Sequence, residues 1–106
     1  MHDNPTNFLS SGIQIKGSIR FENDMHIEGK IEGEITSTSG RVTIGESATI
    51  TGDITAGDVR IYGKVDGKIT SKRCELKQQA RVKGDMKTIS LSMEEGAQLH
   101  GNTEIG

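Results

Sequence analysis

The sequence predicts an all-β fold: a right-handed parallel β-helix (β-solenoid) with a triangular cross-section and about six turns. Three observations support this prediction. A pattern recurs about every 17 residues, apolar and polar residues alternate within each repeat, and aromatic residues make up only 3% of the 106 residues. A short repeat with an internal spacing of two is typical of stacked solenoids. The scarcity of aromatic residues disfavours a conventional globular core.

Five apolar anchors mark the repeat, separated by 17, 17, 15 and 17 positions: Ile27, Ile44, Ile61, Leu76 and Met93. Each anchor follows another apolar residue by two positions. Because successive strand residues face opposite sides, both members of a pair point to one interior. Three straight stretches per repeat account for its length, which predicts a triangular turn. Parallel crossovers are right-handed in nearly all proteins, which predicts the hand of the helix.

The elements follow in order from this repeat. Residues 1–12 show no period, and we predict a flexible N-terminal tail there. The β-helix domain is predicted over 13–106, and its first segment, 13–21, already alternates apolar with polar residues. Glycines recur at the corners, where a chain without a Cβ can turn tightly. The turn at 36–41 is two residues longer than its counterparts.

The cysteine content and the hydropathy predict a cytoplasmic protein. Cys74 is the only cysteine and takes the same position in the repeat as Val42 and Val59, so we expect it to pack as a small apolar residue. The N-terminus does not resemble a signal peptide, and no apolar run is long enough to cross a membrane.

No pattern in the sequence is typical of catalysis or of cofactor binding. His26 and His100 face outward in different repeats and lack partners at a metal-ligand spacing. Residues 52–58 lack the Lys-Ser/Thr of a phosphate-binding loop, and no nucleophile elbow is present. The basic stretch 60–87 is interleaved with acids and holds one aromatic residue, Tyr62. We therefore expect no enzyme, metal, cofactor, nucleotide or nucleic-acid partner.

Two alternatives from other functional classes stay open. Ile44, Ala48, Ile50 and Ile54 fit part of the six-residue rule of left-handed β-helix acyltransferases, although Tyr62 breaks it. Such an enzyme would form closed trimers with ligand pockets. A capped binding rod would instead stay monomeric, whereas an uncapped solenoid would form open filaments.

Charge is distributed in three bands along the chain. Residues 1–59 carry a formal charge of −5, residues 60–87 carry +6, and residues 88–106 carry −3. One hypothesis is that staggered rods pair these bands and form bundles, which salt would weaken.

The two ends of the predicted solenoid lack capping elements, so they should stack on other copies. We predict one polymer interface in the N-terminal layer, formed by Ile13, Ile15, Ile19 and Phe21. We predict a second interface in the C-terminal layer, formed by Ala97, Leu99 and Ile105.

The segments 21–35 (FENDMHIEGKIEGEI) and 42–48 (VTIGESA), with the layered pattern over about 13–103, resemble the bactofilin family of bacterial cytoskeletal proteins. This resemblance implies a β-helix that polymerises through its terminal layers into non-polar filaments without nucleotide. It further implies a scaffold on the inner face of the cytoplasmic membrane that positions cell-wall enzymes or polarity proteins in cell-shape control. Many members reach the membrane through a short apolar N-terminal motif, and Phe8 and Leu9 occupy the corresponding region.

Overall fold

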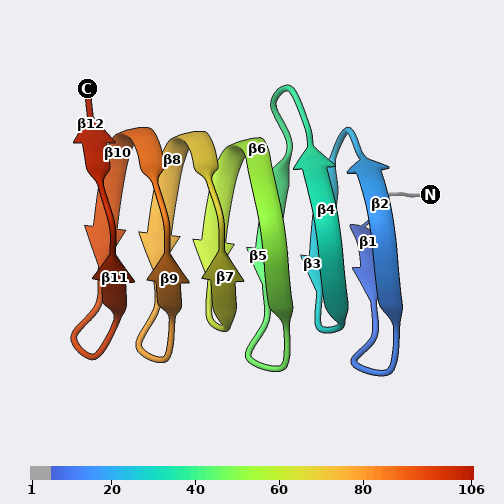
Figure 1. Cartoon of the computed structure of the whole chain (residues 1–106). Coiled ribbons are helices and arrows are strands. Elements are labelled where there is room, and N and C mark those ends of the chain that lie inside the picture. Colours follow the sequence, from blue (N-terminus) through green and yellow to red (C-terminus); the bar gives the residue numbers. More distant parts are fainter. Residues whose placement is uncertain (1–5) are drawn as a thin grey trace.

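The computed structural model describes residues 6–106, which form β-strands and loops without any helix (Figure 1). All strands belong to one 12-stranded sheet in which every pairing is parallel. Their bounds are Thr6–Leu9 (β1), Gln14–Arg20 (β2), Asp24–Ile27 (β3), Lys30–Thr36 (β4), Arg41–Ile44 (β5), Thr49–Ile61 (β6), Lys64–Asp66 (β7), Ile69–Leu76 (β8), Arg81–Lys83 (β9), Met86–Met93 (β10), Gln98–His100 (β11) and Thr103–Ile105 (β12).

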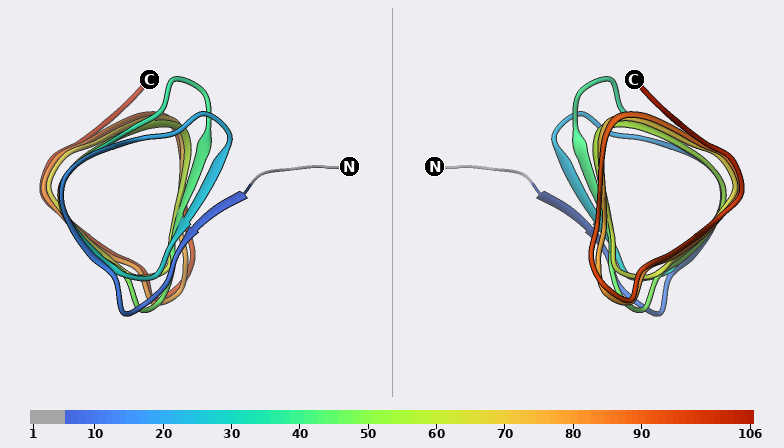
Figure 2. Two further views of the ribbon diagram at one scale, coloured as in Figure 1. Left: turned by 90° about the vertical axis from the view of Figure 1, so that its right-hand side faces the viewer. Right: turned by 90° about the vertical axis from the view of Figure 1, so that its left-hand side faces the viewer.

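The strands wind around one axis as a right-handed solenoid of triangular cross-section (Figure 2). Their pairings stack about six turns along this axis. Three faces result. The first face consists of β1, β3, β5 and the ends of β6, β8 and β10. The second face consists of the starts of β2, β4 and β6, followed by β7, β9 and β11. The third face consists of the ends of β2 and β4, the middle of β6, the starts of β8 and β10, and β12. The predicted fold class is thus confirmed.

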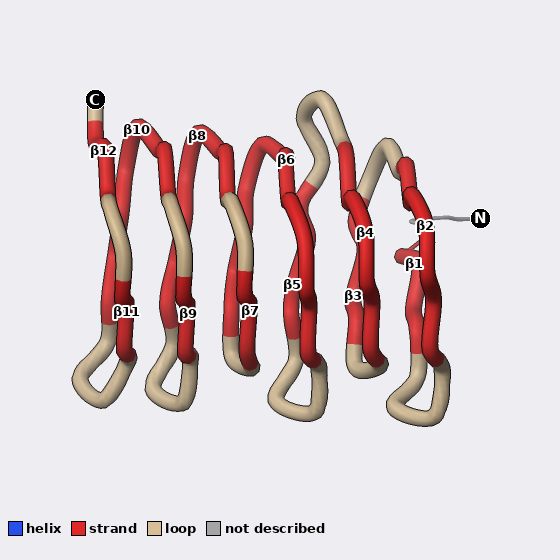
Figure 3. Tube along the Cα trace, viewed as in Figure 1, coloured by secondary structure: helices blue, strands red, loops and turns tan. Residues whose placement is uncertain are grey.

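Equivalent residues of successive turns stack directly on one another. Met25 pairs with Val42, Val42 with Val59, and Val59 with Cys74. The offset between paired residues varies, from 19 positions between β4 and β6 to 15 between β6 and β8. The corners absorb this variation, and the loop at 37–40 projects from the triangle between β4 and β5 (Figures 2 and 3). This is the long turn that the sequence predicts.

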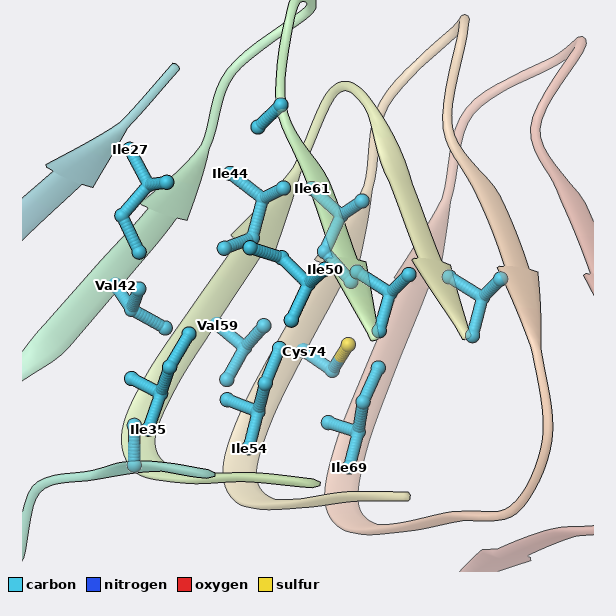
Figure 4. Packing of buried hydrophobic residues seen from close by; sticks show 14 of the residues in the cluster. Ile27, Ile35, Val42, Ile44, Ile50, Ile54, Val59, Ile61, Ile69 and Cys74 are labelled. Carbon is cyan, nitrogen blue, oxygen red and sulfur yellow. The ribbon is translucent and has the colours of Figure 1, made fainter. Parts of the chain in front are cut away.

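The core consists of columns of β-branched side chains (Figure 4). Ile27, Ile44 and Ile61 form one column on the first face, and each is 0% exposed. Burial of one such side chain contributes about 1.5–3 kcal/mol relative to exposure, so stacked Ile and Val supply most of the core stabilisation. Cys74 continues the column of Val42 and Val59 and is fully buried, as predicted.

A column of glycines occupies the corner between the second and third faces. Each has a positive φ between 126° and 147°, and each pairs with the next along the axis: Gly17, Gly33, Gly52, Gly67, Gly84 and Gly101. Stacked backbones approach closely here because no Cβ separates them.

The start of the sheet differs from the predicted boundary. The sequence predicts a tail over 1–12, whereas Thr6–Leu9 forms β1 and pairs with β3. Residues 1–5 of the predicted tail lie outside the described part. β1 supplies the first-face edge of the first turn, so the solenoid starts with a complete triangular layer.

Candidate assembly surfaces at the two ends

The N-terminal end of the solenoid exposes two strand edges. Within the described residues, β1 pairs only with β3 and β2 only with β4. Leu9, Ile15 and Ile19 pack against the core from these strands and stay half-buried. An unpaired strand edge beside an apolar cross-section is a surface on which another chain can add.

The C-terminal end has the same construction. In the described residues, β11 pairs only with β9, and β12 only with β10. Leu91, Ala97 and Leu99 are half-buried against the core. Met93 is 45% exposed and Ile105 is 57% exposed, so this end also presents exposed apolar side chains.

The residues predicted for the two joints lie in different environments. Ile15 and Ile19 lie in the first layer, and Ala97, Leu99 and Ile105 lie in the last. Ile13 lies in the turn before β2 and is 39% exposed. Phe21 is only 5% exposed and belongs to the buried cluster, so it offers little area to another copy.

Three end-layer residues are absent from the predicted joints: Leu9, Leu91 and Met93. The repeat itself contains the signal for two of them, because Leu91 and Met93 pair with Cys74 and Leu76 in the preceding turn. They are the last members of two neighbouring inward columns. Leu9 pairs with Ile27, but it lies in the segment that the sequence assigns to the tail.

The end layers carry charges of opposite sign. The first turn holds Lys16 and Arg20, and the last holds Glu94, Glu95 and Glu104. The Nζ of Lys77 lies 3.5 Å from Oε2 of Glu94, and the Nζ of Lys87 lies 3.8 Å from Oε2 of Glu104. Lysines of the preceding layer therefore partly neutralise the acidic end.

Ion pairs connect neighbouring turns along the first face. Arg60 Nε donates to Glu75 Oε2 at 3.0 Å, and Lys77 Nζ lies 3.4 Å from the same oxygen. The Nε of Arg41 lies 3.8 Å from Oδ2 of Asp58 and connects β5 to the following turn. Burial alone would raise the pKa of Glu75, but the hydrogen bond from Lys77 and the charge of Arg60 outweigh it and lower the pKa.

The predicted membrane-contact residues, Phe8 and Leu9, point in different directions. Phe8 is 58% exposed and stacks on His26, with ring centroids 5.0 Å apart and planes 8° apart. Leu9 packs against the core. His26 lies 2.7 Å from Glu28, and this hydrogen bond lowers the pKa of Glu28. Stacking on His26 therefore fixes Phe8 on the outer surface of the first turn.

Nothing in the described residues forms a group of three or more His, Cys, Asp or Glu side chains able to hold a metal ion. Burial, with a smaller contribution from Glu75, raises the pKa of Cys74 to about 12, so its thiol is protonated at neutral pH. No helix within the described range is long and apolar enough to span a membrane.

Comparison with known proteins places this architecture in one family. The family model for bactofilins, described as polymer-forming cytoskeletal proteins, matches residues 7–104. Bactofilin BacO of Myxococcus xanthus (strain DK1622) is 34% identical over 98 residues, which cover 92% of this chain and 77% of BacO. Bactofilin BacP of the same organism is 25% identical over 99 residues, which cover 92% of this chain and 41% of BacP.

Two solved structures share the fold. The bactofilin of Thermus thermophilus, determined in double helical filaments, superposes with a TM-score of 0.90 at 25% identity, covering 94% of this chain and 99% of its own. The cytoskeletal bactofilin BacA, solved by solid-state NMR, gives a TM-score of 0.87 at 32% identity, covering 95% and 96%. The left-handed acyltransferase alternative does not fit this right-handed architecture. The chain belongs to the bactofilin family of polymer-forming cytoskeletal proteins.

Proposed function

We propose that the two end layers are the joints of a homopolymeric filament, with a purely structural role and no catalysis. The observation that carries this proposal is the pair of open strand edges, each beside half-buried apolar side chains. The N-terminal joint consists of Leu9, Ile15 and Ile19, with Ile13 at its rim. The C-terminal joint consists of Leu91, Met93, Ala97, Leu99 and Ile105.

Each joint would pair like with like and produce a non-polar filament. Two acidic C-terminal ends then face each other, and the lysine contacts of Glu94 and Glu104 reduce their repulsion. Apolar contact and strand-edge pairing supply the attraction, so no nucleotide is required.

The cellular part of the proposal is a scaffold that lies in the cytoplasm, peripheral to the inner face of the cytoplasmic membrane. It would position cell-wall enzymes or polarity proteins during cell-shape control. Phe8 is exposed enough to contact lipid. A single apolar side chain binds a membrane weakly, so this contact would depend on avidity along a filament.

Two charge insertions test the joints: Ile15→Arg at one end and Leu99→Arg at the other. A non-polar filament predicts that each variant stops at dimers through its intact joint, and that the double variant is monomeric. Both residues are half-buried at an end, so an arginine can reach solvent in the free subunit. Sedimentation velocity and negative-stain microscopy measure the outcome.

Thr55→Arg is the matched control because Thr55 lies exposed on the side of a middle turn. It should leave filaments intact. Monomers from either single variant would indicate head-to-tail polar joints instead. Long filaments in both variants would exclude these surfaces as joints.

A further inference from the structure

The outward charges of the solenoid are segregated by face. The second face carries five cations: Lys16, Lys30, Lys64, Arg81 and Lys83. Only two carboxylates share this face, Glu32 and Asp66. The formal charge of this face is therefore +3, although the whole chain carries −2.

The cations of the second face differ from those of the first in their pairing. On the first face Arg60 and Lys77 contact Glu75 at 3.0 and 3.4 Å. On the second face, the ion pair found among the described residues joins Lys16 and Glu32, at 3.8 Å and with both side chains more than half exposed. No ion pair within the described part holds Lys64, Arg81 or Lys83, so their charge is available to a partner.

The second face is also hollowed along its length. One shallow depression of about 430 Å³ covers β2, β4 and the start of β6. Another, of about 450 Å³, covers the start of β6, β7, β9 and β11. The two depressions adjoin at Thr49 and Thr51 and together extend over all six layers, and we call them the second-face trough. At about 4.8 Å per layer it is roughly 24 Å long, enough for about seven extended residues.

From this charge and shape we propose that the second-face trough binds an acidic, extended segment of a partner protein. Carboxylates of the segment would pair with Lys64, Arg81 and Lys83, while Thr49 and Gln98 offer uncharged hydrogen-bonding groups. A concave trough fits an extended chain better than a flat lipid surface. The described lining contains no Phe, Tyr or Trp side chain on which nucleic-acid bases could stack.

This inference rests on the proposed scaffold function and identifies where the scaffold would hold a client. End-to-end assembly continues the solenoid axis, so successive subunits would present one trough after another along the filament. Even an acidic segment that binds a single trough weakly would then be retained by avidity, if its protein carried several copies of the segment or was itself oligomeric.

The test measures binding of a fluorescein-labelled 12-residue peptide of alternating Glu and Ser to the full chain, by fluorescence anisotropy at low salt. A peptide with Gln in place of Glu is the ligand control. The variant Lys64→Gln/Arg81→Gln/Lys83→Gln removes the three unpaired cations. We expect it to weaken binding of the Glu peptide about tenfold, because several exposed charge contacts are lost together.

Lys68→Gln/Lys72→Gln/Arg73→Gln is the matched control, since it removes the same charge from exposed positions outside the trough lining. It should bind the Glu peptide nearly as well as the unmodified chain. Equal weakening in both variants would overturn the proposal, because net charge alone would then explain binding.

Phosphatidylglycerol vesicles and duplex DNA test the other classes of anion. Suppose that the unmodified chain binds one of these anions but not the Glu peptide, and that the trough variant loses this binding. The trough would then be assigned to lipid or nucleic acid, and binding of a protein segment would be refuted. Electron microscopy of the same samples separates this result from the filament proposal. Absent filaments would refute the joints, whereas intact filaments without peptide binding would refute only the trough.

Discussion

At the scale of single residues, the glycine corner imposes the strictest requirement on side-chain size. A Cβ at Gly52 would collide with the carbonyl oxygen of Gly33 in the preceding turn, and the φ of Gly52 is +139°. The residue therefore meets two independent demands, a close backbone approach and a conformation that other residues rarely adopt. At Gly12, in contrast, a Cβ would meet no atom within 4 Å, and the φ of this residue is not positive.

Gly52→Ala should consequently lower the free energy of unfolding by at least about 2 kcal/mol, through steric clash and backbone strain. Gly12→Ala should change it by less than about 0.5 kcal/mol. Chemical denaturation measures both, in the monomeric Ile15→Arg/Leu99→Arg background so that association does not contribute to stability. Equal stability of the two variants would show that the corner can relax around a methyl group.

At the scale of elements, the strands of the first face are joined by the ion pairs of Glu75. This carboxylate contacts Arg60 on the preceding turn and Lys77 on its own. Its pKa lies below the ordinary value because these cations outweigh the effect of burial. The pairs therefore stabilise the fold fully above the ordinary carboxyl pKa, and this contribution is lost as pH falls through the lowered pKa.

Glu75→Gln should thus destabilise the chain by about 0.5–1 kcal/mol at neutral pH, the range typical of partly exposed ion pairs. The difference from the unmodified chain should shrink as the pH falls through the lowered pKa of Glu75, because both chains then carry an uncharged side chain at this position. Denaturation midpoints recorded between pH 3 and pH 8 measure it. Glu46→Gln, in an exposed corner loop, is the control and should show no such trend.

At the scale of the whole molecule, charge varies along the axis as well as between faces. From residue 6 onward, the acidic band up to residue 59, the basic band 60–87 and the acidic band 88–106 lie in successive turns. Staggered neighbouring filaments can therefore align opposite bands. The end joints consist mainly of apolar side chains, so the two kinds of contact should respond differently to salt.

Raising the salt from about 20 mM to about 500 mM shortens the screening length from roughly 20 Å to under 5 Å. Lateral bundles should then separate into single filaments, while the filaments themselves persist. Bundle width and filament length from negative-stain micrographs report the two effects separately. A bundle width that does not change with salt would contradict pairing of the charge bands.

The sequence was sufficient for the fold because each turn repeats the same requirement. The pairs Val42/Ile44 and Val59/Ile61 alternate with polar residues at a constant spacing, and alternation is the feature that strand geometry determines directly. The ends could not be predicted as fully. The burial of Phe21 and the inclusion of Leu9 in a strand both depend on the packing of the first layer. No repeat precedes this layer in the pattern, so the sequence offers nothing to compare it with.

The second-face trough could not be predicted from the sequence for a related reason. Lys64, Arg81 and Lys83 are visible in the sequence as part of a basic stretch, together with Arg60 and Lys77. Only the stacking of turns separates cations that are paired on the first face from cations that remain unpaired on the second.

The projecting loop at 37–40 has a practical consequence. The turns on either side of it stay in register although the chain there is longer than at the equivalent corners. The additional residues at this corner therefore project outward from the side of the solenoid and leave the stacking of the turns unchanged. A fluorescent protein or an epitope tag inserted in this loop should decorate the side of a filament and leave both of its ends free to join.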